Sequence, residues 1–287
     1  MSRVETRARS GYPVRPWGAG SFRLIERHGR AYGHAWLVFA SGVAEPLFYL
    51  LSVGVGIGGL IGTVAGPGGT AVPYREFVAP GLLAVSALNG AMYDSTFNIY
   101  GRMKFAKLYD AVLATPIGPG EVALGEVGWA VLRGALYAVA FMLVMLALGL
   151  LHTPWALLAI PGAVLISFTV ASVGVACTTY MKSWQDFDYV LLVSVPLFLF
   201  SATFYPLSVY PPVIADIVQW TPLYQGVVLL RDLVLGVPSP ELLWRAGYLA
   251  ALGAVGLTVA GRRIAKLLLV LPANNGVSPG FPQGLTG

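Results

Sequence analysis

Long apolar runs follow one another along the chain, separated by short connections rich in Gly, Pro and charged residues. Six runs come close to the roughly 20 residues that a helix needs to cross a bilayer. Gly and Pro interrupt regular structure, so each run is predicted to be a separate membrane-spanning helix. The predicted spans cover residues 35–61, 77–99, 127–151, 155–179, 189–205 and 242–260.

Two segments mix apolar and polar positions and do not fit a simple span. Residues 21–33 combine Phe22 and Leu24 with several arginines, which favours a helix lying in the inner interface, although a plain positively charged anchor explains them equally well. Residues 206–240 contain several prolines and acidic residues, and they predict short helices that enter the outer leaflet and return. Within the long first span, Pro46 predicts a break in the helix.

Composition agrees with a lipid-embedded chain. Of the 287 residues, 56% are hydrophobic and 11% charged, and the mean hydropathy of +0.72 excludes a soluble domain. The net charge of +5 does not indicate a nucleic-acid partner, because the basic residues gather on alternate connections as the positive-inside rule requires. We therefore expect both termini in the cytoplasm. The predicted organisation is a basic arm (residues 1–20), a six-span domain (21–270) and a disordered tail (271–287).

The sequence contains no motif that indicates catalysis or nucleotide binding. Residues 54–59 (GVGIGG) match a dinucleotide fingerprint by letter, but they end a predicted span, where small residues instead let helices pack closely. No Walker loop, metal-ligand spacing or catalytic triad is present, so no metal and no enzyme activity are expected. Cys177 is the sole cysteine and is interpreted as a small packing residue.

Three ionisable residues fall inside predicted spans, where each charge costs roughly 2.5–3.5 kcal/mol near the centre. They are Glu45, Asp94 and Arg133. One interpretation is that they line a substrate path or form an interhelical pair. The alternative is that Asp94 and Arg133 reach the inner interface as structural anchors. Glu45 is harder to explain in this way, since a carboxylate side chain is short.

The inner connection at residues 101–121 has a different character. It joins charged residues to a short helical pattern and ends in a Pro/Gly stop at residues 116–120. A short helix on the inner side of the membrane is a natural docking point for a cytoplasmic partner, and an ordinary interfacial loop is the alternative.

Several short stretches, in this order, resemble one known family. They are residues 44–51 (AEPLFYLL) followed by the glycines of 54–59, 74–81 (YREFVAPG), 95–103 (STFNIYGRM), 114–116 (ATP), 125–130 (GEVGWA), 204–207 (FYPL) and 230–236 (LRDLVLG). Together they resemble the permease subunits of type-2 ABC exporters, and within these the nodulation lipo-oligosaccharide and drug exporter branch. The resemblance covers residues 22–268 and leaves out the basic arm and the tail.

The resemblance implies an all-α integral membrane protein with six transmembrane helices, an N-terminal interfacial helix and an outer re-entrant segment between spans five and six. It implies a permease in the bacterial inner membrane that pairs with a second permease copy, as a homodimer, and with cytoplasmic ABC ATPase subunits. ATP and magnesium would bind the ATPase, and this chain would carry no cofactor. The exported substrate would be amphipathic: a lipid, a lipo-oligosaccharide or a drug.

The resemblance also suggests roles for particular residues. Contact with the ATPase is expected at Arg102, Lys104, Tyr109, Asp110, Leu113, Thr115 and Pro116. An outer gate is expected at Tyr205, Pro206, Trp220 and Arg231. An ion-coupled secondary transporter, a membrane-embedded enzyme and a regulatory membrane subunit without transport activity remain as alternatives.

Overall fold

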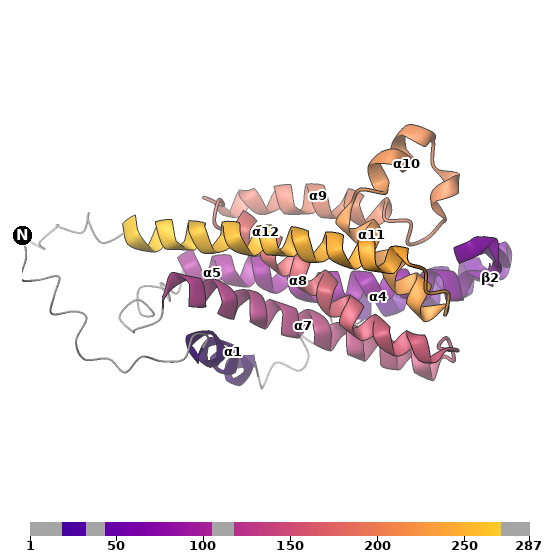
Figure 1. Ribbon diagram of the computed structural model, residues 1–287, viewed down its shortest axis with the longest axis horizontal. Coiled ribbons are helices and arrows are strands. Elements are labelled where there is room, and N and C mark those ends of the chain that lie inside the picture. Colours follow the sequence, from indigo (N-terminus) through magenta and orange to yellow (C-terminus); the bar gives the residue numbers. More distant parts are fainter. Residues whose placement is uncertain (1–18, 33–43, 105–117, 271–287) are drawn as a thin grey trace, which may run out of the picture.

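The computed structural model describes residues 19–32, 44–104 and 118–270. Its long helices α4, α7, α8 and α12 run along one axis as a bundle (Figure 1). Helix α1 (Ala19–Tyr32) lies across one end of this bundle, and a small β-hairpin lies at the opposite end. Large apolar side chains cover much of the outside, among them Leu143 and Leu192, as a lipid-facing surface requires. The predicted mostly helical membrane fold is confirmed.

Four described helices are long and apolar enough to cross a membrane. A fifth is added if α10 (Pro212–Val218) and α11 (Pro222–Val234), which meet at 83°, form one broken span. Two further predicted spans correspond to α4 (Tyr74–Tyr93) and α9 (Phe187–Leu199). With 13 residues, α9 is only about 20 Å long, less than the ~30 Å hydrocarbon core. The four helices that are long and apolar enough to cross a membrane are Ala44–Ile61, Pro119–Ala147, Pro154–Thr178 and Glu241–Leu267.

Two of the helical runs contain π-helical turns. One of them starts at Ala44 as an α-helix. It becomes the π-helix η1 (Leu50–Ile57) and then continues as α3 (Gly58–Ile61). The described helix therefore continues through Pro46, and its irregular part begins one turn later. The second run passes from α4 through the π-helix η3 (Asp94–Asn98) into α5 (Ile99–Lys104).

Several predicted boundaries were wrong. Helix α7 (Pro119–Ala147) begins eight residues before the predicted third span, because Pro119 occupies the first turn of the helix, where its missing N–H has no cost. The fifth span ends at Leu199, because the chain turns through Ala202, which has a positive φ of 55°. Helix α12 (Glu241–Val270) continues ten residues past the predicted end.

A short β-hairpin was not predicted at all. Strands β1 (Thr63–Ala65) and β2 (Ala71–Pro73) pair antiparallel around the 3-10 turn η2 (Pro67–Gly69). The signal was present in the sequence, since Gly-Pro-Gly-Gly lies between residues of high β propensity. Gly68 and Gly69 both have a positive φ, which other residues rarely adopt.

The remaining elements complete the packing. Helix α8 (Ala159–Thr178) lies in the middle of the bundle between α4, α7 and α12, and its Ser167 hydroxyl donates to the carbonyls of Ala163 and Ala87. Gly134 of α7 permits the close crossing with α4 and α8, since a Cβ there would lie 2.8 Å from the Ala87 carbonyl oxygen. The short 3-10 elements are η4 (Pro154–Leu158), η5 (Trp184–Asp186) and η6 (Leu207–Val209).

Candidate functional site

Helix α1 is amphipathic and packs one face against the bundle. Ser21, Leu24 and His28 are spaced three and four residues apart, which places them on one side of a helix, and all three are buried. Phe22 and Arg27 lie outside this face and are exposed. An amphipathic helix is therefore present where one was predicted, and its position in the inner interface stays a prediction.

The start of α1 is fixed to the start of α7. Gly125 of α7 permits the contact, because a Cβ there would lie 3.0 Å from the Cβ of Leu24. One turn earlier, Glu121 accepts a hydrogen bond from the Gly20 N–H at 3.4 Å, and its main-chain carbonyl accepts one from the Ser21 hydroxyl at 2.8 Å. A carboxylate at a helix N-terminus also interacts favourably with the helix dipole.

Beside this contact lies a buried network of four charged side chains. The guanidinium of Arg102 lies 2.7 Å from the carboxylate of Glu126 and 3.5 Å from that of Asp94. The other oxygen of Asp94 lies 3.4 Å from the guanidinium of Arg133. Asp94 and Glu126 are fully buried, and Arg133 is 5% exposed. The network therefore joins η3, α5 and α7.

Neutral groups complete the shell around these charges. Asn98 donates to Asp94 at 2.6 Å, and Arg133 donates to the Tyr137 hydroxyl at 3.1 Å. Removing an ion from water costs several kcal/mol, which the attraction offsets only when the geometry is good and the remaining polar atoms are bonded. Among the described residues, two carboxylates and two guanidinium groups balance in sign.

His28 connects α1 to the same network. Its Nε2 lies 3.8 Å from a carboxylate oxygen of Glu126, and its ring centre lies 5.7 Å from that of Trp129. Burial, followed by the nearby positive charge of Arg102, lowers the pKa of His28 from 6.5 to about 4. The imidazole is therefore neutral near pH 7. Within the described part of the chain, neither ring nitrogen has a hydrogen-bond partner.

The π-helix η3 positions Asp94 at the centre of the network. The Ile99 N–H bonds the Asp94 carbonyl five residues earlier, as π geometry requires. From α8, the Thr178 hydroxyl donates to the Ser95 carbonyl at 2.9 Å, so a main-chain group of the irregular turn is satisfied by a neighbouring helix. Irregular turns of this kind are frequent at functional sites.

Comparison with known proteins shows the family of this chain. The ABC-2 type transporter family matches residues 22–235. The chain belongs to the ABC-2 type transporter family. It is a multi-pass membrane protein and a transport permease.

The relatives of this permease support the assignment. Nodulation protein J of Rhizobium leguminosarum bv. trifolii is 32% identical over 72% of this chain and 78% of its own length. Nodulation protein J of R. leguminosarum bv. viciae is 28% identical over 79% of this chain and 86% of its own. The inner membrane transport permease YadH of Escherichia coli is 25% identical over 72% of this chain and 79% of its own.

At the opposite end of the permease, Arg231 of α11 makes a second buried polar contact. Its guanidinium donates to the carbonyls of Phe77 at 3.1 Å and Ala202 at 2.8 Å, and lies 3.8 Å from the centre of the Phe77 ring. Pro80, inside α4, has no N–H to bond the carbonyl of Glu76, which is next to the Phe77 carbonyl that Arg231 bonds. Arg231 thus holds the turn after α9 against α4.

The other residues predicted for an outer gate are not gathered with Arg231. Tyr205 is 37% exposed and its ring lies 5.0 Å from that of Tyr210. Pro206 precedes η6, and Trp220 is 62% exposed at the bend between α10 and α11. The gate stays a prediction, and only Arg231 of the four lies inside the protein.

Of the residues predicted for a substrate path, Asp94 and Arg133 come together as the interhelical pair that was one of the alternatives. They do not reach toward water, since both are buried. Glu45 lies apart. It is exposed, and the Asn89 amide donates to its carboxylate at 3.4 Å.

The predicted ATPase contacts fall largely outside the described residues. Arg102 is described and belongs to the buried network, and Lys104 is the last residue of α5. The others, which lie outside the described ranges, are Tyr109, Asp110, Leu113, Thr115 and Pro116. Their contact with an ATPase stays a prediction.

Sequence reasoning missed Glu126 and His28 as members of the network. A signal for Glu126 existed, because it precedes Arg133 by seven residues, which is two helical turns and therefore the same face of α7. His28 carried a similar signal, since it lies four residues after Leu24 on the apolar face of α1. Neither of these spacings shows which other helix Glu126 or His28 would contact.

Proposed function

We propose that this permease is the membrane subunit of an ATP-driven exporter that moves an amphipathic substrate outward across a bacterial inner membrane. Two copies of the chain would form the path, and cytoplasmic ABC ATPase subunits would bind and hydrolyse ATP with magnesium. The family supports an ABC ATPase as the general partner.

One observation supports a coupling role most directly. The buried charges and His28 join α1, the inner half of the second helical run and the start of α7 into one unit. The segment between α5 and α7, with the predicted ATPase contacts Asp110 and Leu113, connects two parts of this unit. A push on that segment would move the second helical run and α7 together, because separating them would expose uncompensated charges, and α1 would follow through its packing and hydrogen bonds to α7.

The proposed topology has six spans with both termini in the cytoplasm. The run α4–η3–α5 would form the second span and α9 the fifth, while α10 and α11 would form the outer re-entrant segment. The bend of 83° between α10 and α11 supports a segment that turns back before crossing. The basic residues Arg262, Arg263 and Lys266 at the end of α12 favour the inner side for that end.

The proposed substrate class follows from the relatives. Proteins named for nodulation are similar over most of their length, and the resemblance stated above points to the lipo-oligosaccharide branch. A lipo-oligosaccharide has an apolar tail and a polar head, so a path beside lipid would suit it. A lipid or a drug remains the competing substrate.

The test is purification of the chain from its native membrane in mild detergent, with analysis of the proteins that accompany it. We expect an ABC ATPase in equal amount, and we expect Asp110→Arg or Leu113→Arg to release it. Gln185→Arg is the matched control, since Gln185 is an exposed residue of another connection that is proposed to face inward. A folded chain that purifies without an ATPase would contradict the proposal.

A further inference from the structure

Helix α9 is held to the bundle mainly at its two ends. At one end Phe187 stacks on Phe97 with ring centres 4.3 Å apart, and at the other end Phe198 lies 5.6 Å from Tyr49. Of the 13 residues of α9, only Phe187 is buried. Between the two ends, the Ser194 hydroxyl reaches the Met92 sulfur at 3.2 Å. Apart from this contact, the middle of α9 is largely exposed.

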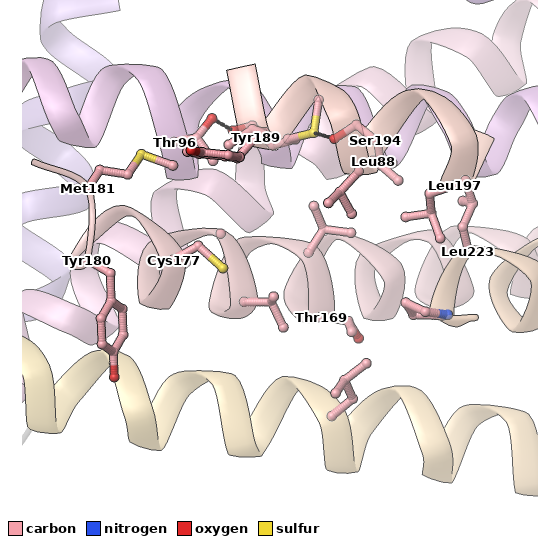
Figure 2. A pocket seen from close by; sticks show the side chains of 18 of the residues that line it. Leu88, Thr96, Thr169, Cys177, Tyr180, Met181, Tyr189, Ser194, Leu197 and Leu223 are labelled. Carbon is pink, nitrogen blue, oxygen red and sulfur yellow. Dashed lines mark hydrogen bonds between the residues drawn. The ribbon is translucent and has the colours of Figure 1, made fainter. Parts of the chain in front are cut away.

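A cleft of about 780 Å³ lies between α9 on one side and α4, α8 and α12 on the other. Figure 2 shows its labelled side chains distributed along the length of α8, from Tyr180 and Met181 at one end to Leu197 and Leu223 at the other. Apart from the thiol of Cys177 and a few hydroxyls, its middle is apolar. The volume lies within the roughly 300–1,000 Å³ of sites that hold small molecules.

The length of the cleft matches one leaflet of a bilayer. Asp186 and Leu197 both line it and are eleven residues apart along the chain, which corresponds to about 16 Å of helix. Half of a hydrocarbon core about 30 Å thick is about 15 Å. A single acyl chain that enters at the Asp186 end would therefore reach close to the other end of the cleft.

The Asp186 end of the cleft is polar and carries charges of both signs. Lys182 is exposed there, and the guanidinium of Arg263 lies 3.9 Å from the centre of the Tyr180 ring, which lines the cleft. The Nε of Arg263 is buried and has no hydrogen-bond partner among the described residues. Lys182 therefore lines the cleft, and Arg263 lies next to a ring that lines it.

The one carboxylate that lines this end is already engaged. Asp186 accepts hydrogen bonds from the N–H groups of Lys182 and Ser183 at 2.6 and 3.1 Å, and from the Ser183 hydroxyl at 3.2 Å. These bonds lower the pKa of Asp186, so it remains charged and bound within its own turn. Asp186 therefore keeps its negative charge at the mouth, where that charge also interacts with Lys182.

We propose that this cleft binds one acyl chain of an anionic phospholipid from the inner leaflet, with the phosphate of the headgroup held at Lys182 and Arg263. Basic pockets between membrane helices bind lipid headgroups in this way. The assignment to the inner leaflet rests on the proposed topology, whereas the cleft and its preference for an anionic lipid do not depend on any ATPase.

Cys177 lines the cleft and is the sole cysteine of the chain, so it reports on occupancy without an added label. The purified chain is placed in nanodiscs of phosphatidylcholine with increasing phosphatidylglycerol, and the rate of Cys177 alkylation by N-ethylmaleimide is measured. We expect phosphatidylglycerol to slow alkylation until the effect saturates. We expect Lys182→Gln or Arg263→Gln to raise the fraction of phosphatidylglycerol needed by about fivefold each, because one basic residue contributes about 1 kcal/mol near an anionic surface.

Two controls separate binding from bulk effects. In a Cys177→Ser background, Leu143→Cys places a thiol on the exposed side of α7, and its alkylation should not depend on the lipid class. Val193→Trp fills the cleft from α9, and it should reduce the phosphatidylglycerol that remains bound after purification, as measured by mass spectrometry of extracted lipid. Val193 is 65% exposed, so this change does not disturb the packed core.

Three results would overturn the proposal. The first is equal protection by phosphatidylcholine and phosphatidylglycerol, and the second is unchanged protection in both charge variants. The third is protection that follows dimer formation whatever the lipid, which would mean that a second copy of the chain covers the cleft. Failure of the proposed ATPase partnership would leave these measurements unaffected, so the two hypotheses fail separately.

Discussion

At the residue scale, Asp94 is the group on which the buried network depends most, since it pairs with both Arg102 and Arg133. Replacing Asp94 removes one carboxylate partner from Arg102 and one from Arg133. Breaking a buried ion pair is more damaging than replacing the whole pair, because the remaining charge stays in a medium of low polarity.

Asp94→Asn keeps the shape of the side chain and removes its charge. We expect the free energy of unfolding in detergent to fall by about 3–5 kcal/mol, because two buried guanidinium groups lose a counter-charge. The measurement is the midpoint of denaturation in mixed micelles. Glu45→Gln is the matched control, since Glu45 is exposed and its one described contact is the Asn89 amide. Equal losses in the two variants would show that the network does not stabilise the fold.

His28 predicts a dependence of stability on pH. Its pKa is lowered to about 4 in the folded protein, so below pH 6.5 the unfolded chain binds a proton that the folded chain does not. This contribution to stability is fully present above pH 6.5 and is lost as the pH falls from 6.5 toward 4. Between pH 7.5 and 5.0 we expect a loss of up to about 2 kcal/mol.

The measurement is thermal unfolding of the purified chain across that pH range. His28→Gln should have a flatter pH dependence than the wild type. His152→Gln changes an exposed histidine and should retain the wild-type slope. A wild-type slope in His28→Gln would place the titrating group elsewhere in the chain.

At the element scale, apolar periodicity located the helices but not their irregular parts. The fourth predicted span, residues 155–179, agrees closely with η4 and α8, because almost every residue there is apolar and the ends are marked by Pro154 and by a polar turn. The π-helix η3 was not foreseen. Its extra residue per turn depends on bonds from α8, such as that of Thr178, and these are long-range contacts that local pattern cannot supply.

The pairing of charges across helices was only partly predictable for the same reason. The cost of burying Asp94 and Arg133 predicted a partner or a route to water, and sequence spacing alone did not choose between them. Glu126 and Arg133 share a face of α7, but the position of Arg102 between Glu126 and Asp94 depends on how α5 continues η3. That continuation is a property of the folded chain.

The contact of α1 with α7 gives a prediction for an element. Gly125→Leu places a side chain where Leu24 now packs, so α1 should be displaced and lose its hydrogen bonds to Glu121. We expect faster trypsin cleavage after Arg23 and Arg27, since a docked helix resists proteolysis and a released helix does not.

Gly120→Leu is the control for this experiment. Gly120 lies in the first turn of the same helix, and a Cβ there would meet nothing within 4 Å. Its cleavage pattern should match that of the wild type. Unchanged cleavage in Gly125→Leu would mean that α1 does not depend on the close approach of α7.

At the scale of the whole molecule, the bundle has polar contacts of different character at its two ends. One end holds the charged network and α1, and the other holds Arg231, which bonds main-chain carbonyls of α4 and of the turn after α9. Between them, the bundle is packed through apolar side chains and α9 is only loosely attached. A movement of the helices that passes from one end of the bundle to the other would therefore start at the charged network and reach the contacts of Arg231.

Arg102→Gln tests this transmission in the proposed complex. The substitution removes a guanidinium that lies between Asp94 and Glu126, so movement of the inner connection should no longer be passed to α7. We expect the ATPase still to co-purify, while the substrate-stimulated part of ATP hydrolysis is lost. Lys266→Gln removes an exposed cation at the end of α12 and should leave stimulation intact. Retained stimulation in Arg102→Gln would exclude the network as the coupling element.

The charge balance of the buried network has a consequence for the energised cell. A transmembrane voltage acts on each moving elementary charge with about 2.3 kcal/mol per 100 mV. The four described charges of the network, Asp94, Glu126, Arg102 and Arg133, balance in sign, so their joint displacement across part of the bilayer would itself do almost no electrical work. These four side chains would therefore add almost nothing to any effect of the membrane voltage on a shift of their helices.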